Sequence, residues 1–369
     1  MHPSTIVSLT PAYHNGHSGT VELLLGKGAS IGPVNQYGNT PLHLAAQNGY
    51  SGTVELLLGK GASIGAMNQQ GDTPLHVAVL NGHTGTVELL LGKGASIEVI
   101  GQFGRTPLHH AAERGHTGTV AILLVGGASI ETMSKSENVT PLHLAAENGQ
   151  TSSVELLLAK CASIGAMNQY GDTPLHGAAL NGHTGIVELL LGKGASIGAM
   201  NQHGDTPLHL AAYNGYSGIV ELLLGKGASS EAIGQFGRTP LHWAAQNGHT
   251  STVRLLLGKG AAIEAMDKHN TTPLLIAAET GHTDTVELLL GRGASIQAID
   301  KDSDTPLHCA ALGGCVGVVE LLLKQGASIQ ATNKDHKTPL QLATQKGHTA
   351  IVELLENKVA EFVVHGNSV

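Results

Sequence analysis

Thr40-Pro41-Leu42-His43 is the stretch of sequence that decides the fold. Threonine and proline return together in phase, with the threonine at positions 40, 73, 106, 140, 173, 206, 239, 272, 305 and 338. Eight of the nine intervals are 33 residues long and one is 34. Two copies have lost the histidine, to Leu275 and Gln341. A fixed period of this length predicts a repeat architecture, in which each repeat packs against its neighbours.

Each repeat carries local signals for two short helices. Thr40 can cap a first helix with its hydroxyl group, and Pro41 suits the first helical position, where an N–H has no partner. Gly49 predicts the end of this helix, in a left-handed conformation. A second helix, ending at Gly61, is expected from apolar residues at helical spacing. They are Val54, Leu57 and Leu58. Residues 35–39 predict a turn between two short strands.

A turn followed by two helices, with this motif at the start of the first helix, is the pattern of the ankyrin repeat. The chain resembles that family from about residue 5 to about residue 360. The resemblance implies an all-α fold with short β-hairpin tips, an elongated and curved α-solenoid of stacked helix-turn-helix repeats. It also implies that the motif histidine hydrogen-bonds to backbone and to the neighbouring threonine. Family members bind partners through the tips and the exposed face of the first helices, which line a concave groove.

The motif positions predict four parts of the chain. These are a degenerate N-terminal repeat (1–33), nine regular repeats (34–331), a C-terminal capping repeat (332–361) and a frayed tail (362–369). In the first part, Val7-Ser8-Leu9-Thr10 replaces the motif, and Pro11 interrupts the first helix. This is either a native end cap or the start of an array cut from a longer one; the intact, apolar second helix favours the latter. One extra residue at 134–139 predicts a distorted tip and unbroken helix stacking.

Composition and charge limit the kinds of partner and the cellular compartment that we expect for this protein. Aromatic residues make up only 3% of the chain, which suits a thin stack of layers. A net charge of −8 argues against nucleic acid, which favours a basic surface. No apolar run reaches the length of a membrane span, so no membrane partner is expected. Three cysteines form no even disulfide framework and indicate a reducing compartment. We therefore expect a monomeric protein of the cytoplasm, with the nucleus left open.

No catalytic residue, cofactor or metal is expected, despite 22 histidines. The motif histidines come one to a layer, so neighbouring rings stand about 8–10 Å apart, whereas zinc needs its nitrogen ligands at about 2.0–2.1 Å. The chain contains no nucleophile elbow, zinc-protease motif or phosphate loop. The recurrent Gly59-Lys60-Gly61-Ala62-Ser63 resembles a phosphate loop only superficially, since it ends a helix instead of beginning one.

Variable residues on a constant framework predict a protein-binding surface. The candidates at the tips are Tyr37, Asn39, Gln70, Asp72, Phe103, Arg105, Tyr170, Asp172, His203, Asp205, Phe236 and Arg238, and those on first helices are Leu80, Leu180, Tyr213 and Trp243. Six of the ten aromatic residues belong to this set, and aromatic and arginine side chains anchor interfaces. The first hypothesis is a non-catalytic scaffold or adaptor that binds another protein. The alternative is a regulatory or targeting array of a larger enzyme or signalling protein.

A longer period overlies the short one. The segment from Asn35 recurs from Asn168, 133 residues further on, and residues 102–105 recur at 235–238. A block of four repeats has therefore been duplicated. Shared ancestry alone would explain the similarity of the two copies; paired binding of a repetitive or dimeric partner is the alternative.

Overall fold

A computed structural model describes residues 18–366, with side-chain surroundings as far as Ala360. The altered first motif and Pro11 lie outside the described residues. Contacts divide the chain into two compact bodies, which are described separately. The N-terminal body comprises Met1–Ala178 with Gly192–Ala195, and the C-terminal body comprises Ala179–Leu191 with Ser196–Val369.

Two helices per repeat account for the architecture. The first helices are α3 (Pro41–Gln47), α5 (Pro74–Leu80), α7 (Pro107–Arg114), α9 (Pro141–Glu147), α11 (Pro174–Leu180), α13 (Pro207–Tyr213), α15 (Pro240–Gln246), α17 (Pro273–Thr280), α19 (Pro306–Gly313) and α21 (Pro339–Lys346). The second helices are α2 (Ser18–Gly26), α4 (Ser51–Gly59), α6 (Thr84–Gly92), α8 (Thr117–Val125), α10 (Thr151–Ala159), α12 (Thr184–Gly192), α14 (Ser217–Gly225), α16 (Thr250–Gly258), α18 (Thr283–Gly291), α20 (Val316–Lys324) and α22 (Thr349–Gly366).

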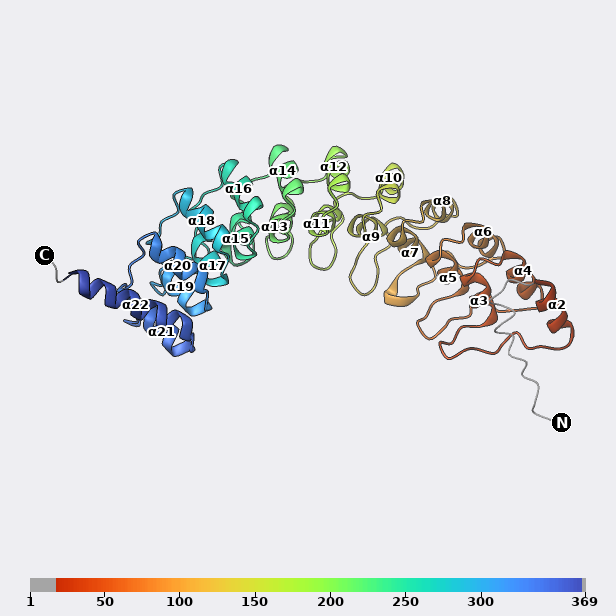
Figure 1. The fold of residues 1–369 in the computed structure, drawn as a ribbon. Helices are drawn as coiled ribbons and strands as arrows, with labels where there is room; N and C mark the ends of the chain where they lie inside the picture. Colours follow the sequence, from red (N-terminus) through yellow and green to blue (C-terminus); the bar gives the residue numbers. More distant parts are fainter. Residues whose placement is uncertain (1–17, 367–369) are drawn as a thin grey trace, which may run out of the picture. The chain divides into compact units, whose positions relative to one another are not determined.

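Each body has two layers of helices (Figure 1). In the N-terminal body, α3, α5, α7 and α9 pack side by side in one layer, and α2, α4, α6, α8 and α10 in the other. The C-terminal body repeats this arrangement, with the odd-numbered helices from α13 to α21 in one layer and the even-numbered helices from α14 to α22 in the other. Small residues such as Ala45 and Ala46, both fully buried, allow the first helices to approach closely. The structure is the all-α helical solenoid that the sequence predicts.

The motif threonine starts the first helices, and the motif histidine, as at His43, can both support this cap and join the helix to the next repeat. The Thr40 backbone N–H donates to His43 Nδ1 over 3.1 Å, and the Thr40 hydroxyl lies 2.8 Å from the same nitrogen. His43 Nε2 then bonds to the backbone oxygen of Asp72 in the following repeat, at 3.0 Å. Because Nδ1 accepts from a backbone N–H, the ring is neutral with its proton on Nε2. The role that the family resemblance implies for this histidine is therefore confirmed.

A second set of histidines, whose role the sequence analysis did not predict, joins repeats in the opposite direction. His83 Nε2 bonds to the backbone oxygen of Gln47, at the end of the preceding first helix, over 2.9 Å. His116, His249, His282 and His348 make the equivalent bond. Each such ring satisfies a carbonyl group that the end of a helix leaves without an intrahelical partner.

Residues in the left-handed conformation end the helices. Gly49 follows a first helix with φ of +71° and Gly61 follows a second helix with φ of +88°. Cys161 stands in the place of Gly61 and adopts a φ of +67°. A side chain is strained in this region of φ, so this cysteine carries mild backbone strain.

The tips are turns, and the expected hairpin strands are wrong: no strand occurs in residues 18–366. In one tip, the Asn35 N–H donates to the Asn39 oxygen at 3.1 Å and the Gly38 N–H to the Asn35 oxygen at 2.9 Å. Neighbouring tips are joined by a hydrogen bond such as that from the Gln69 N–H to the Tyr37 oxygen, at 3.1 Å. A strand ladder needs a succession of such bonds, and the short tips do not provide it.

The tip with the extra residue closes one residue later than the others. The Asn138 N–H donates to the Ser134 oxygen at 3.1 Å, and Asn138 itself adopts a φ of +53°. The helices on either side, α7 and α9, still pack against each other. The insertion is therefore absorbed within the turn.

The last helix is longer than the sequence predicts. Helix α22 continues to Gly366 and so extends beyond residue 361, the expected end of the capping repeat; the frayed tail stays a prediction. No Gly-Ala pair interrupts residues 357–361, which include the good helix formers Lys358 and Ala360. Without that stop signal the helix propagates.

Candidate protein-binding surface

The turns and the C-terminal ends of the first helices, here called the tip surface, display exposed aromatic side chains in the N-terminal body. Tyr37 is 60% exposed, Phe103 58% and Tyr170 49%. Gln70 is exposed as well, and Leu80 is half-buried. Exposed aromatic side chains are enriched at protein interfaces relative to the rest of the surface, which makes these three rings candidates for contact with a partner.

Two of the polar candidates of this body, Asn39 and Asp172, contribute less. Asn39 is half-buried, and its Oδ1 accepts a hydrogen bond from Asn68 Nδ2 at 2.9 Å. Asp172 is half-buried, and its backbone oxygen is bonded to His143 Nε2 at 3.0 Å. Both residues connect neighbouring repeats.

A phenylalanine and an arginine form a compact cluster at the third tip of this body. Phe103 adopts a φ of +56°, a conformation that bulky residues rarely occupy. The Arg105 guanidinium lies 5.4 Å from the centre of the Phe103 ring, within the range of a cation–π interaction. Arg105 also pairs with Glu113 at 2.8 Å and with Glu137 at 3.3 Å. The ion pairs fix the guanidinium, which in turn supports the exposed ring.

The carboxylates around Arg105 give this tip an acidic character. The pKa of Glu113 falls to about 2, because His110 Nδ1, 3.6 Å from its carboxylate, and the Arg105 guanidinium together outweigh burial. The pKa of Glu147 is raised by burial and by the carboxylates of Glu137 and Glu113. Glu113 therefore remains charged at every physiological pH.

The duplicated tip in the C-terminal body keeps the phenylalanine and arginine but changes their neighbours. Phe236 is 49% exposed with a φ of +59°, and the Arg238 guanidinium lies 5.8 Å from its ring centre. Arg238 also lies 4.9 Å from the centre of the Trp243 ring, and it pairs with Asp267 at 3.3 Å and with Gln246. Glu113 of the first copy thus corresponds to a neutral glutamine, and the two copies present different charges.

Trp243 is not displayed, contrary to the prediction from its place on a first helix. Its side chain is only 8% exposed. The Tyr213 ring packs against it edge to face, with centroids 5.6 Å apart, and Arg238 covers it as described above. Tyr213, 45% exposed, is the aromatic residue that this part of the tip surface presents.

Two further candidates, Asp72 and Asp205, are buried and belong to the framework. Asp72 is 2% exposed, and its Oδ1 accepts from the Gln102 N–H of the next repeat at 2.9 Å. Asp205 makes the same bond to Gln235 at 3.0 Å. A Cβ atom at Gly101 would collide with the Asp72 carboxylate. The glycine and the aspartate are therefore one structural pair.

Asp72→Ala is expected to lower the free energy of unfolding by about 1–2 kcal/mol, because a part-buried N–H loses its acceptor. Urea denaturation followed by circular dichroism measures this loss. Asp72→Asn keeps an acceptor oxygen in place and is expected to cost less. Equal losses for the two variants would contradict the assigned hydrogen bond.

The remaining candidates of the C-terminal body are exposed. Leu180 is 40% exposed at the end of α11, and its backbone oxygen accepts a hydrogen bond from Asn214 at 3.2 Å. His203 is exposed at a tip, where its N–H donates to the Asn201 side chain at 3.0 Å. These residues extend the tip surface beyond the cluster around Phe236.

Neither a metal centre nor a membrane span stands out in the described structure. Among residues 18–366, no group of three or more histidine, cysteine, aspartate or glutamate side chains is placed to hold a metal ion. None of the helices in that range combines the length and apolar character needed to cross a bilayer.

The comparison with known protein families agrees with the class of protein that the fold indicates. The family model for ankyrin repeats in three copies matches residues 9–100, 97–168, 160–233, 229–300 and 293–364. The chain belongs to the ankyrin repeat family, whose repeats generally serve as protein–protein interaction modules. No curated protein matches its sequence.

Proposed function

We propose that this protein is a non-catalytic scaffold or adaptor that binds a protein partner through its tip surface. The observation that carries the proposal is the exposure of Tyr37, Phe103, Phe236 and Tyr213 in a chain otherwise poor in aromatic residues. Aromatic side chains of this kind supply most of the binding energy at many interfaces. The ankyrin family to which the chain belongs supports the same class of function.

The conformation of the two phenylalanines also supports the proposal. Both have positive φ in a tip where glycine is the neighbouring residue. Strain of this kind persists only when the surrounding structure imposes it, and it is common at functional sites. The arginine beneath each ring reduces the entropy that the ring would lose on binding, because the side chain is already held in place.

We further propose that the protein works in the cytoplasm. Cys161, Cys309 and Cys315 are all free thiols, which is the usual state of cysteines in a reducing compartment.

Phe103→Ala with Phe236→Ala and Tyr213→Ala is expected to reduce capture of the partner by about tenfold or more. Affinity capture from cells with the tagged full chain, followed by quantitative mass spectrometry, identifies the proteins lost. Thermal unfolding is expected to change little, since all three rings are exposed. Variants limited to Phe103, or to Phe236 with Tyr213, show which body carries the contact.

Val125→Ala is the matched control. Val125 is 83% exposed at the end of α8, in the layer of second helices. Its replacement removes an exposed apolar side chain away from the tip surface and should leave capture unchanged. If the triple variant captured the same proteins in the same amounts as the native chain, the tip surface would not be the binding site.

A further inference from the structure

Charged residues of neighbouring second helices stand at a fixed separation in the sequence, here called the register, which relates one repeat to the next. In the N-terminal body, Lys93 Nζ pairs with Glu55 Oε1 at 3.0 Å, and the two residues are 38 positions apart. Glutamate and lysine stand at the same separation in further pairs of the sequence. These are Glu22 and Lys60, Glu155 and Lys193, Glu188 and Lys226, Glu221 and Lys259, and Glu320 and Lys358. The spacing of the Glu55–Lys93 ion pair is therefore occupied by opposite charges in these further repeats.

The C-terminal body breaks this register at one place. Arg254 replaces the glutamate in α16, and the residue 38 positions further on is Arg292, at the end of α18. Two cations thus occupy the positions of an ion pair. Both arginines are exposed, and within residues 18–366 neither one forms an ion pair. Like charges so placed repel each other unless an anion lies between them.

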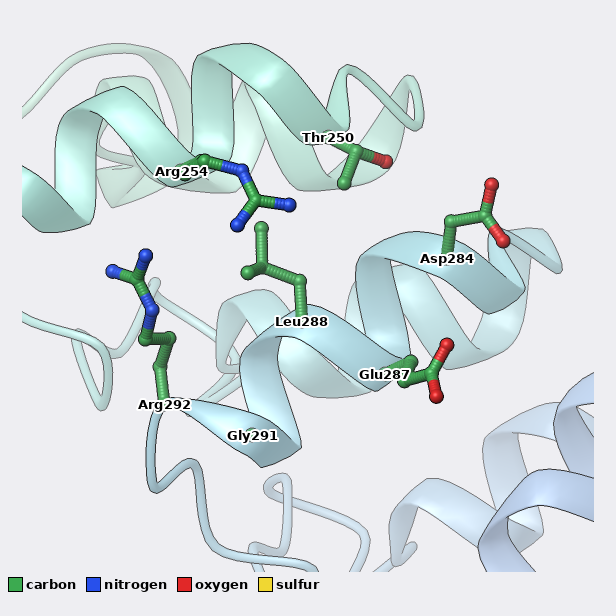
Figure 2. A pocket seen from close by; sticks show the side chains of 7 residues that line it. All are labelled: Thr250, Arg254, Asp284, Glu287, Leu288, Gly291 and Arg292. Atoms are coloured by element: carbon green, nitrogen blue, oxygen red, sulfur yellow. The ribbon is translucent and has the colours of Figure 1, made fainter.

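A pocket lies at this place, between α16 and α18. It has a volume of about 470 Å³ and is lined by Thr250, Arg254, Asp284, Glu287, Leu288, Gly291 and Arg292. Figure 2 shows the Arg254 and Arg292 side chains at one end of the pocket, with Leu288 next to the Arg254 guanidinium and the carboxylates of Asp284 and Glu287 at the other end. Gly291 leaves this surface open, since a Cβ atom there would meet nothing within 4 Å.

We propose that Arg254 and Arg292 bind a phosphate group carried by a phosphorylated serine or threonine of a protein partner. A guanidinium presents N–H donors in a planar fork that fits the oxygens of a phosphate. A phosphate monoester carries nearly two negative charges at neutral pH and can neutralise both arginines. Leu288, half-buried between them, offers an apolar contact for the carbon atoms of the phosphorylated side chain.

The surroundings favour a single phosphate over a polyanion. The carboxylates of Asp284 and Glu287 line the same pocket, and Glu221 lines the adjoining pocket on the other side of Arg254. The whole chain has a net charge of −8. A nucleic acid or an anionic membrane would bring further negative charges against these groups, whereas one phosphorylated side chain brings a single phosphate, which the two arginines can neutralise.

The five arginines of the chain make a direct test possible. We suggest titrating the full chain, labelled with ¹⁵N, with N-acetyl-O-phosphoserine amide at pH 7.5 and constant ionic strength, while recording the Nε–H resonances of arginine. Saturable shifts are expected for Arg254 and Arg292 only, with Arg105, Arg114 and Arg238 as internal references. N-acetylserine amide should cause no shift, and N-acetylaspartate amide should bind more weakly than the phosphoserine.

Arg254→Glu restores a carboxylate opposite Arg292 and is expected to weaken phosphoserine binding about tenfold or more. This variant also restores the ordinary register, so its thermal midpoint should not fall. Arg114→Glu makes the same change of net charge on the exposed end of α7 and should leave the affinity unchanged. Phe103→Ala should have no effect on it either, which separates this proposal from binding at the tip surface.

Three results would overturn the proposal. The first is the absence of saturable shifts at Arg254 and Arg292. The second is an equal loss of affinity in Arg254→Glu and Arg114→Glu, which would indicate a general effect of charge. The third is cosedimentation with phosphatidylserine vesicles that Arg254→Glu abolishes, which would assign the pair to a membrane instead of a protein partner.

Discussion

Lowering the pH from 7 to 5 is expected to reduce the free energy of unfolding by several kcal/mol. Burial lowers the pKa of His76 and of His109 to about 4. A histidine with a pKa of 6.5 in the unfolded chain and about 4 in the folded one costs about 2 kcal/mol at pH 5. Burial also lowers the pKa of four further histidines at this position, His43, His143, His242 and His308.

The loss of stability at low pH follows from the proton that each buried ring would have to accept. In the folded protein, Nδ1 of His109 lies 3.2 Å from the Thr106 N–H, which donates to it, so a proton on Nδ1 would break the cap. The unfolded chain therefore binds more protons than the folded one, and stability is present above pH 6.5 and is lost as the pH falls toward 4. Carboxyl groups with a raised pKa, such as Glu147, act in the opposite direction. Glu113, with a pKa of about 2, does not titrate in this range.

Urea denaturation at pH 7, 6 and 5, followed by circular dichroism, measures the effect. His109→Leu is the matched variant, because Leu275 naturally replaces the histidine and is fully buried. Between pH 7 and 5, the free energy of unfolding of this variant should fall less than that of the native chain. The difference should equal the contribution of one histidine. A stability that stays constant between pH 7 and 5 would show that the buried rings titrate normally.

Trp243→Ala is expected to cost about 3–5 kcal/mol, the usual loss when a buried aromatic residue is truncated. Trp243 is 8% exposed and is covered by Tyr213 and by Arg238. Its removal leaves a cavity in α15 and takes away the ring on which the guanidinium rests. The C-terminal body should therefore unfold at a lower urea concentration, which circular dichroism can follow.

Two further variants separate packing from exposure. Trp243→Leu should recover part of the loss, since Leu44, Leu144 and Leu210 stand at the same position of other repeats. Tyr213→Ala removes a ring that is 45% exposed and should cost much less than Trp243→Ala. If Trp243→Ala unfolded at the same urea concentration as the native chain, the packing of this residue would have been wrongly described.

Signals within one repeat allow the helices to be predicted from the sequence. Thr40 and Pro41 start a helix, and Gly49 ends one, through contacts that span only a few residues. The role of His43 was implied by the family resemblance and not by these local signals. These local rules recur in every repeat, so an error in one would have been corrected by the others.

The features that could not be predicted from the sequence depend on contacts between repeats. Asp72 looks like an exposed turn residue until its acceptor role for Gln102, 30 positions away, is known. Trp243 looks exposed until Tyr213 of the preceding repeat is placed against it. By contrast, the expected hairpin strands are absent for a local reason, because each short tip has too few backbone bonds across its turn to form a strand ladder. The paired arginines at 254 and 292 become visible only once the bond between Glu55 and Lys93 defines the register.

The bonds that His43 and His83 make to the adjoining repeat have a consequence for how such a gene can change length. Each bond reaches only an adjoining repeat, to a residue 29 or 36 positions away in the sequence. When unequal crossing-over copies a whole number of periods, both new junctions meet the contacts they had before, and no compensating mutation is required. The 133-residue duplication is an event of this kind. Divergence, such as glutamine for glutamate beside the copied arginine, can then accumulate in one copy while the other keeps its original partner.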